Sequence, residues 1–561
     1  MKLKLLLVLV LGLLLRIVFL NSLPPGITND EMNITINTQS ILKTGANIPG
    51  VVTGIIGTVG GDTSFGVDSE LTSYLILPFI AAFGFNLISV KLPFILASLG
   101  IAIIGYLLAK KMFDERAAFI AYVLLVFNPW LIFFGRAAYE PMFSSFFYLL
   151  SILLIINFRG WKKLYSVPFL IAGFLCYFSA KTLIIPITLI ASWAAMLLNR
   201  NEEKRSLVVL NIIVFIFVGI YFVLLSHSAA GTRIGELKLS DSTQNVITKR
   251  TASLDIPFTS LFENKIVEEL RIRIPASLGV VNSNYLFFNG QPEVTPSLSI
   301  PDHAFMYLTD LPLIILGIVF MANKFKKQLT VLLSLLVVTL IPNFLNLQGT
   351  TYSIRTVILF PVLAIISAIG IYSLGKNTIQ KIVIVVYAIF ILNFCYIYFA
   401  RLPVQRSEAW FLSERVLSRY VSEVAAKNPD KKIFIVAEQP KLTFYKYLFY
   451  SGNYTNPEQI KLLNSNIENK NYEIENVIIT AECVSKEPGI RIINTNTGCV
   501  KQGGAFIKSI FDAGDIYTIS EDILCQSQTK NKYPLIKNIK ALDIEKLTTE
   551  NFCKNYITDS R

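Results

Sequence analysis

The sequence predicts a polytopic α-helical membrane protein of about eleven transmembrane helices with a C-terminal extracytoplasmic α/β domain. Only 16% of the 561 residues are charged and 53% are hydrophobic, with a mean hydropathy of +0.55, whereas soluble domains have about 25% charged residues. Apolar runs of roughly 17–25 residues, the length that crosses a bilayer, recur up to residue 400. From residue 404 the composition is that of a soluble protein. We therefore predict a membrane domain over 1–403 and a soluble domain over 404–561.

The first apolar segment, residues 3–20, has the basic start and apolar core that are typical of a signal peptide. No small-residue cleavage site follows it, so we expect an uncleaved first span. The other predicted spans are 92–109, 117–134, 141–157, 164–180, 182–198, 206–225, 304–322, 328–345, 356–374 and 379–400. A further apolar segment, 72–85, is short and follows a polar stretch.

The basic residues indicate that segment 72–85 does not cross the membrane. If it lies in the outer leaflet, every short loop with a cluster of Lys and Arg falls on the side of the N-terminus, which the positive-inside rule makes cytoplasmic. The opposite short loops carry single cations. The clusters are Lys2 and Lys4; Lys110, Lys111 and Arg116; Arg159, Lys162 and Lys163; Arg200, Lys204 and Arg205; Lys324, Lys326 and Lys327; Lys376 and Lys381. We predict a multi-pass protein of the plasma or inner membrane.

This topology places the long loops 21–91 and 226–303, together with the C-terminal domain, on the extracytoplasmic side. Binding and catalytic residues concentrate on loops that a rigid scaffold holds, so we expect these two loops to form the active-site face. The net charge of +13 is explained by the orienting loops, and we therefore do not expect nucleic-acid binding.

The six cysteines fall into two groups. Cys176 and Cys395 lie inside apolar spans and are expected to pack as inert side chains. The others lie in the C-terminal domain without the CxxC spacing of a zinc site, and an oxidising compartment would permit disulfides among them. The local pairs are one of three possible connectivities: Cys483 with Cys499, and Cys525 with Cys553.

An acidic pair, Asp30 and Glu31, opens the first long loop just beyond the first span. A carboxylate that is partly buried at the membrane surface has a raised pKa and can act as a general base. The alternative is a solvated acidic turn.

Three cations lie at extracytoplasmic ends of predicted spans: Arg136, Lys181 and Arg355. Arg136 and Glu140 are four residues apart and would share a helical face, which fits either an interfacial ion pair or a cation that is presented to a lipid phosphate. Lys181 lies where two spans meet, and a charge at that depth suggests a functional site. Together with the acidic pair, these cations suit a membrane-borne phosphate donor and a hydroxyl acceptor.

The histidines, His227 and His303, do not form a metal-ligand cluster. We expect His303, which follows Asp302 at the outer start of a span, to be an interfacial polar residue. No nucleotide-binding loop or Ser-His-Asp pattern is present.

A set of short motifs is distributed along most of the membrane domain. They are Leu14-Leu15-Arg16, Leu23-Pro24-Pro25-Gly26 with Asp30-Glu31, Ser40-Ile41-Leu42-Lys43-Thr44-Gly45, Lys91-Leu92-Pro93, Asn128-Pro129-Trp130 through Arg136 to Glu140, Tyr285-Leu286-Phe287-Phe288-Asn289-Gly290 and Leu311-Pro312-Leu313. The pattern resembles the C-type (GT-C) membrane glycosyltransferases, in the branch of the dolichyl-phosphate-mannose protein mannosyltransferases and bacterial aminoarabinose transferases.

The resemblance implies transfer of a sugar from a polyprenyl-phosphate-linked donor to a hydroxyl of a protein, lipid or cell-surface glycan, with inversion. Asp30 would be the general base and Glu31 would assist or position it. By the same resemblance, Arg136, Glu140, Lys181 and Arg355 would line the lipid-phosphate site, with Lys43, Lys91, Asp302 and His303 at its rim. No cofactor is expected, and a divalent metal is left open.

Two departures from the family pattern stand out. Asp68-Ser69-Glu70-Leu71 replaces the Lys-Pro-Pro of many relatives, and Lys91 and Lys181 stand where relatives often carry Arg, which weakens bidentate phosphate contacts. Two other functions are kept as alternatives. One is a transporter or flippase for lipid-linked glycans, although the inverted repeats and broken helices of transporters are not evident. The other is a non-catalytic assembly protein of the cell envelope.

In the C-terminal domain, runs at 431–437, 477–480 and 516–519 have the apolar, β-branched composition of strands. An aromatic stretch, 444–450, between the first two is expected to be helical. We therefore predict a small α/β domain that binds acceptor or partner, or shields the site.

Overall fold

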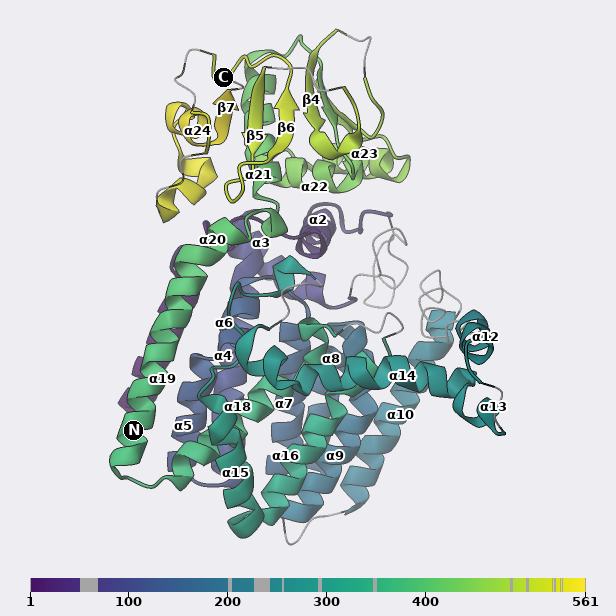
Figure 1. Cartoon of the computed structure of the whole chain (residues 1–561), viewed down its shortest axis with the longest axis vertical. Helices are drawn as coiled ribbons and strands as arrows, with labels where there is room; N and C mark the ends of the chain where they lie inside the picture. Colours follow the sequence, from purple (N-terminus) through teal and green to yellow (C-terminus); the bar gives the residue numbers. More distant parts are fainter. Residues whose placement is uncertain are drawn as a thin grey trace.

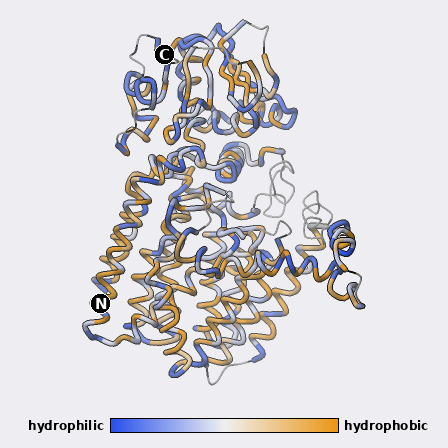
Figure 2. Tube along the Cα trace, in the orientation of Figure 1, coloured by the Kyte–Doolittle hydropathy of each residue, from blue (hydrophilic) through white to orange (hydrophobic). Residues whose placement is uncertain are grey.

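The computed structural model describes residues 2–50, 69–199, 204–226, 243–254, 257–290, 295–346, 351–484, 488–500, 504–526, 528, 531–534, 536 and 538–559. Figure 1 shows a bundle of long helices with a sheet-containing unit stacked on one end. Figure 2 shows that the helices of the bundle are mostly hydrophobic and that the stacked unit alternates between hydrophobic and hydrophilic. This contrast matches the change of composition at residue 404.

The bundle contains α-helices at each of the predicted spans. They are α1 Lys2–Ile17, α4 Leu87–Met112, α5 Glu115–Val126, α6 Pro129–Arg136, α7 Pro141–Asn157, α8 Val167–Leu175, α9 Ile184–Leu198, α10 Lys204–Ser226, α15 Asp310–Lys324, α16 Lys326–Val338, α18 Leu359–Ser373 and α19 Thr378–Tyr396. By length and composition, five helical stretches in the described chain can cross a membrane, or six with one bent pair. The chain is therefore built as a membrane protein, and the count of eleven spans stays a prediction.

The bent pair is α5 and α6, whose axes meet at 47°. Pro129 cannot donate a backbone hydrogen bond and so ends a continuous helix. Asn128 restarts it, because its Oδ1 accepts a hydrogen bond from the backbone N of Leu131 at 3.1 Å. The break directs α6 and its last residue, Arg136, into the protein interior.

Helices α2 (Asn29–Thr44) and α3 (Thr72–Phe83) come from the first long loop. With 12 residues, α3 is about 18 Å long at ~1.5 Å per residue, which is shorter than the ~30 Å hydrocarbon core of a bilayer. That 72–85 does not cross stays a prediction, as does the membrane orientation.

The second long loop and its surroundings form short elements at the same end of the bundle as α2. They are α12 Thr243–Thr251, α13 Thr259–Phe262, α14 Lys265–Leu278, η5 Gly279–Val281, η6 Asn284–Phe288, η7 Pro296–Leu298, α17 Ile341–Phe344 and η8 Ser353–Thr356. Two short 3-10 helices, η2 Gly160–Ser166 and η3 Ser179–Leu183, precede α8 and α9.

The C-terminal unit is a seven-stranded sheet with helices, which confirms the predicted α/β character. Its strand order is β2-β3-β1-β4-β6-β5-β7, in which β1 is parallel to β3 and β4 and the other pairs are antiparallel. The strands are β1 Ile433–Val436, β2 Glu473–Ile474, β3 Val477–Thr480, β4 Ile490–Asn494, β5 Ala505–Lys508, β6 Asp515–Ile519 and β7 Ile557–Asp559. The helices are α21 Leu412–Lys427, α22 Pro440–Ser451, α23 Pro457–Glu468 and α24 Thr549–Tyr556.

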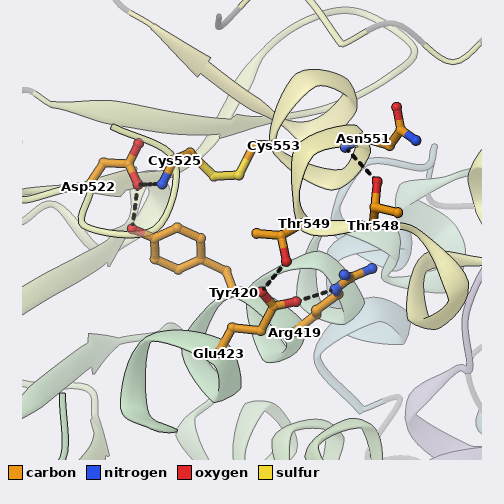
Figure 3. Close-up of a disulfide and its surroundings, with 9 residues drawn as sticks. All are labelled: Arg419, Tyr420, Glu423, Asp522, Cys525, Thr548, Thr549, Asn551 and Cys553. Atoms are coloured by element: carbon orange, nitrogen blue, oxygen red, sulfur yellow. Dashed lines mark hydrogen bonds and ion pairs between the residues drawn. A yellow bond between two sulfur atoms is a disulfide. The ribbon is translucent and has the colours of Figure 1, made fainter. Parts of the chain in front are cut away.

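The structure contains both local disulfides, Cys483–Cys499 and Cys525–Cys553. Figure 3 shows the second, which ties α24 to the segment after β6. Asp522 supports this bridge, since its Oδ1 accepts hydrogen bonds from the Cys525 backbone N at 3.0 Å and the Tyr420 hydroxyl at 2.9 Å.

The C-terminal unit packs directly on the first long loop. Arg415 of α21 is fully buried, and its Nη1 donates to the backbone carbonyls of Asn21 at 3.0 Å and Pro25 at 2.7 Å. Gly26 is required at this contact, because a Cβ there would lie 2.0 Å from the carbonyl oxygen of Trp410. The predicted boundary at 403/404 falls within α20 (Leu402–Gln405), and the independence of the two domains stays a prediction.

A carboxyl group at this junction makes stability depend on pH. Glu408 is partly exposed, but its Oε1 is buried. Burial, reinforced by the negative charges of Glu414 and Asp512, raises the Glu408 pKa from 4.5 to about 7. The folded state therefore keeps a proton that the unfolded state loses between pH 4.5 and 7, and stability falls as the pH rises through this window.

We expect Glu408→Gln to reduce this loss, which is on the order of 2 kcal/mol after allowance for partial exposure. The measurement is the thermal unfolding midpoint of the purified protein at pH 5 and pH 8. The wild type should lose more stability than the variant between the two, and equal losses would contradict the assignment.

Candidate active site

The N-terminus of α2 is built by a capping box. Thr28 and Glu31 have the Thr-x-x-Glu spacing of this motif. Oε2 of Glu31 accepts hydrogen bonds from the Thr28 backbone N at 2.7 Å and hydroxyl at 2.8 Å, and Oε1 accepts one from the Ala138 backbone N at 2.6 Å. Glu31 is fully buried. It thus fixes α2 against the turn after α6, which makes it a positioning residue.

Asp30, one residue earlier, is exposed in the first turn of α2. Its negative charge acts on two buried phenols, those of Tyr139 and Tyr177. The capping box therefore separates the roles of the two acids: Glu31 is engaged inside the protein, and Asp30 presents its carboxylate at the surface of the site.

Tyr177, in the turn between α8 and η3, is buried, and several charges act on it. Its hydroxyl is under the electrostatic influence of the Arg355 cation and of the Glu140 and Asp30 carboxylates. These three charges come from segments that are distant in sequence, so the fold brings each of them within electrostatic range of one phenol.

Arg355 lies in η8 and is half-buried, with its guanidinium carbon 4.7 Å from the centroid of the Tyr352 ring. Among the described residues, no carboxylate lies within ion-pair distance of Arg355. Stacking on a ring leaves the edge of a guanidinium able to donate to an anion. The role of Arg355 as a phosphate-binding cation stays a prediction.

Glu140 also acts on Tyr177, but its carboxylate is not suited to bind a phosphate directly. Its Oε1 accepts a hydrogen bond from the Ser69 backbone N at 3.1 Å, and a carboxylate would repel a phosphate. It does not pair with Arg136, although the two were expected to share a helical face, because α6 ends at Arg136 and α7 starts at Pro141.

Arg136 has a different role from the one that the sequence suggested. Its side chain is fully buried and makes five hydrogen bonds. Nε donates to the Tyr398 hydroxyl at 3.1 Å, while Nη1 and Nη2 donate to backbone carbonyls at 2.9–3.0 Å. The carbonyls belong to Leu15, Arg16, Val18 and Leu23. A guanidinium has five N–H donors, so none is left for a lipid phosphate, and Arg136 instead clamps the end of α1.

Lys181 is also not available as a phosphate-binding cation. It is buried, and its Nζ donates to Oε1 of Glu70 at 2.5 Å and to the Tyr221 hydroxyl at 2.6 Å. The Tyr221 hydroxyl also donates to Glu70. The ammonium is therefore neutralised by a fully buried carboxylate. Glu70 was noted in the sequence only as a departure from the family pattern, although a lysine inside a span calls for an acidic partner.

We expect the effects of substitutions at Glu70 and Lys181 on stability to be strongly coupled. Glu70→Gln or Lys181→Met alone should destabilise the protein by roughly 3–5 kcal/mol, because each leaves an uncompensated buried charge. The double variant should recover a large part of that loss. Thermal unfolding of the four proteins in detergent measures the cycle, and additive losses would show that the pair is not coupled.

The four residues predicted at the rim have separate positions. Lys91 is fully buried, and its Nζ donates to the Pro24 and Gly26 carbonyls at 3.5 and 3.4 Å, so it supports the loop before Asp30 from behind. Lys43 is exposed in the last turn of α2, 13 residues after Asp30 and thus ~20 Å along the helix. Lys43 therefore does not belong to the rim.

Asp302 and His303 make contacts with other residues. Asp302 is exposed and pairs with Arg401. His303 is buried rather than interfacial: its ring packs against Tyr307 and Phe394, and burial lowers its pKa. His227 lies outside the described residues. In the part of the chain that is described, no three His, Cys, Asp or Glu side chains are grouped as metal ligands.

No protein-family model and no curated protein matches the chain. Among solved structures, one is an archaeal oligosaccharyltransferase, AglB from Archaeoglobus fulgidus, in complex with an inhibitory peptide and a dolichol-phosphate. It is 13% identical with a TM-score of 0.47, over 88% of this chain and 69% of that one. Another is ArnT from Cupriavidus metallidurans, at 11% identity and a TM-score of 0.47 in the apo state, and at 12% and 0.44 when bound to undecaprenyl phosphate. Both cover 92% of this chain and 97% of the other.

Proposed function

We propose that the protein is a membrane glycosyltransferase of the GT-C type that uses a polyprenyl-phosphate-linked sugar and acts on the extracytoplasmic side of the plasma or inner membrane. The observation that carries the proposal is that an exposed carboxylate, Asp30, and the Arg355 guanidinium both act electrostatically on one buried phenol, Tyr177. A base and an anion-binding cation at one site are the groups that transfer from a phosphate leaving group to a hydroxyl needs.

In the proposed reaction, Asp30 accepts the proton of the acceptor hydroxyl as the acceptor oxygen attacks the anomeric carbon of the sugar. The bond between this carbon and the phosphate oxygen breaks, and its electron pair leaves with polyprenyl phosphate. Arg355 stabilises the negative charge that develops on the departing phosphate. One displacement of this kind inverts the anomeric configuration.

The proposed topology has eleven spans, a cytoplasmic N-terminus, a membrane domain over 1–403 and a soluble domain over 404–561. Under this proposal the buried contacts of Arg415, Glu31 and Lys91 serve to position the segment that carries Asp30. The acceptor is a hydroxyl of a protein, a lipid or a cell-surface glycan.

The test is an assay of the full-length protein in lipid nanodiscs with a panel of polyprenyl-phosphate sugars, in which release of polyprenyl phosphate is followed. Arg355→Gln should lower donor use by about 10–100-fold, because a hydrogen bond to a charged group contributes roughly 1.5–3 kcal/mol. Lys43→Gln, at the far end of α2, is the matched control. Movement of lipid-linked glycans across vesicle membranes without release would support the transporter alternative, and the absence of both activities would support the assembly protein.

A further inference from the structure

Helix α14 has its amphipathic faces reversed relative to a helix in a water-soluble protein. Its exposed side chains form an apolar row at four-residue spacing: Ile266, Leu270, Ile274 and Leu278, which are 70%, 39%, 44% and 51% exposed. Its buried face is polar. Water would not favour this arrangement, because exposed contiguous apolar side chains mark a surface that another apolar phase covers.

Polar side chains of the buried face form hydrogen bonds to the bundle. Arg273 donates from Nε to Glu269 at 2.8 Å and from Nη1 to the Phe344 carbonyl at 3.2 Å, and the Ser277 hydroxyl donates to the Leu340 carbonyl at 3.0 Å. These carbonyls end the helical stretch Lys326–Phe344, one of the five that can cross a membrane. The bonds therefore hold α14 at the level where that span leaves the hydrocarbon core.

The orientation of α14 also fits a position at the end of the spans. In Figure 1, α14 runs across the long axes of α9, α10 and α16. The apolar surface continues into α13 and the residue before it, where Phe258, Leu261 and Phe262 are 71%, 64% and 64% exposed. A helix that lies across the spans at their ends, with an apolar edge and a polar edge, has the geometry of an interfacial helix.

We propose that α13 and α14 form an in-plane membrane anchor, in which the row Ile266, Leu270, Ile274 and Leu278 contacts the acyl chains of phospholipids. Ion pairs neutralise two of the charges next to the row, since Arg271 lies 2.8 Å from Glu263 and Lys249 lies 2.5 Å from Glu268. The row itself carries no charge, which favours acyl chains over a polar partner.

The anchor has a consequence for the active site, and this consequence rests on the proposed function. The Thr351 hydroxyl donates to the Ala276 carbonyl of α14 at 3.0 Å, and its side chain packs at Gly279. Thr351 lies just before η8, the element that carries Arg355. The anchor thereby holds Arg355 at the height of the phosphate groups of membrane-bound lipids.

The test is the depth of spin labels in nanodiscs. Single cysteines are introduced at Ile266, Leu270 and Ile274 in a protein whose two free cysteines, Cys176 and Cys395, are replaced by alanine. The collision rate of each label with oxygen, which concentrates in acyl chains, is compared with its collision rate with the water-soluble nickel complex NiEDDA. Two exposed apolar positions calibrate the scale: Ile216 of α10, for a side chain expected in lipid, and Leu462 of the C-terminal unit, for one expected in water.

We expect oxygen to dominate severalfold at the three α14 positions, as at Ile216, and NiEDDA to dominate at Leu462. NiEDDA access at α14 equal to that at Leu462 would overturn the proposal. Protection from both reagents would also overturn it, because a protein surface or a second copy of the chain would then cover the row. The readout needs no turnover, so its failure leaves the transferase proposal standing. An inactive protein with labels at the expected depth would count against the transferase alone.

Discussion

Asp30→Asn is expected to lower the rate of polyprenyl phosphate release by about 10²–10⁴-fold, the range that a positioned general base contributes. The amide has the shape of the carboxylate but cannot accept the proton of the acceptor hydroxyl. Asp30 is exposed, and the capping bonds of α2 are made by Thr28 and Glu31. The substitution should therefore leave the capping box intact, and it removes the favourable contact of one negative charge with the helix N-terminus, ~0.3–1 kcal/mol.

The measurement is release of polyprenyl phosphate at saturating donor, with thermal unfolding of the same samples. Asp302→Asn is the matched control, since Asp302 is also an exposed aspartate but pairs with Arg401 and is not among the charges that act on Tyr177. It should retain wild-type activity. If Asp30→Asn releases polyprenyl phosphate at the wild-type rate, Asp30 is not the base. Equal losses in both aspartate variants would point to a general effect of charge.

Arg136→Met is expected to destabilise the folded protein by at least ~4 kcal/mol. Four buried backbone carbonyls at the end of α1 lose their donor, and each buried group left unsatisfied costs ~1–3 kcal/mol. Arg136→Lys should recover little, because an ammonium has three donors where the site uses five. Thermal unfolding and the yield of monodisperse protein in detergent measure the effect.

The comparison with Arg355 separates structure from function. Arg355→Met removes a half-buried cation that stacks on Tyr352, and it should lower activity while the unfolding midpoint stays close to that of the wild type. Arg136→Met should do the reverse. Little of the protein should fold, but each folded molecule should keep normal activity. A stable Arg136→Met protein that has lost donor binding would restore Arg136 to the phosphate site.

The apolar runs and the composition were sufficient to locate the long helices of the bundle and three strands of the C-terminal sheet, β1, β3 and β6. Apolar runs of bilayer length coincide with helices because burial of apolar side chains, in lipid or in the bundle, is a property of the local sequence. The capping box at Thr28 and Glu31 is likewise local, and so is the break at Asn128-Pro129. These features depend on residues within a few positions of one another, which the sequence displays directly.

The sequence by itself determined which charges this protein carries near the ends of its helices, and only the tertiary structure decided which of them are available for chemistry. Lys181 is neutralised by Glu70, which lies 111 positions away, and Arg136 donates to carbonyls that lie 113–121 positions away. Arg355 has no such carboxylate partner among the described residues. The physical reason is that the free energy of a buried charge depends on its partners in space, and partners so distant in sequence leave no local pattern.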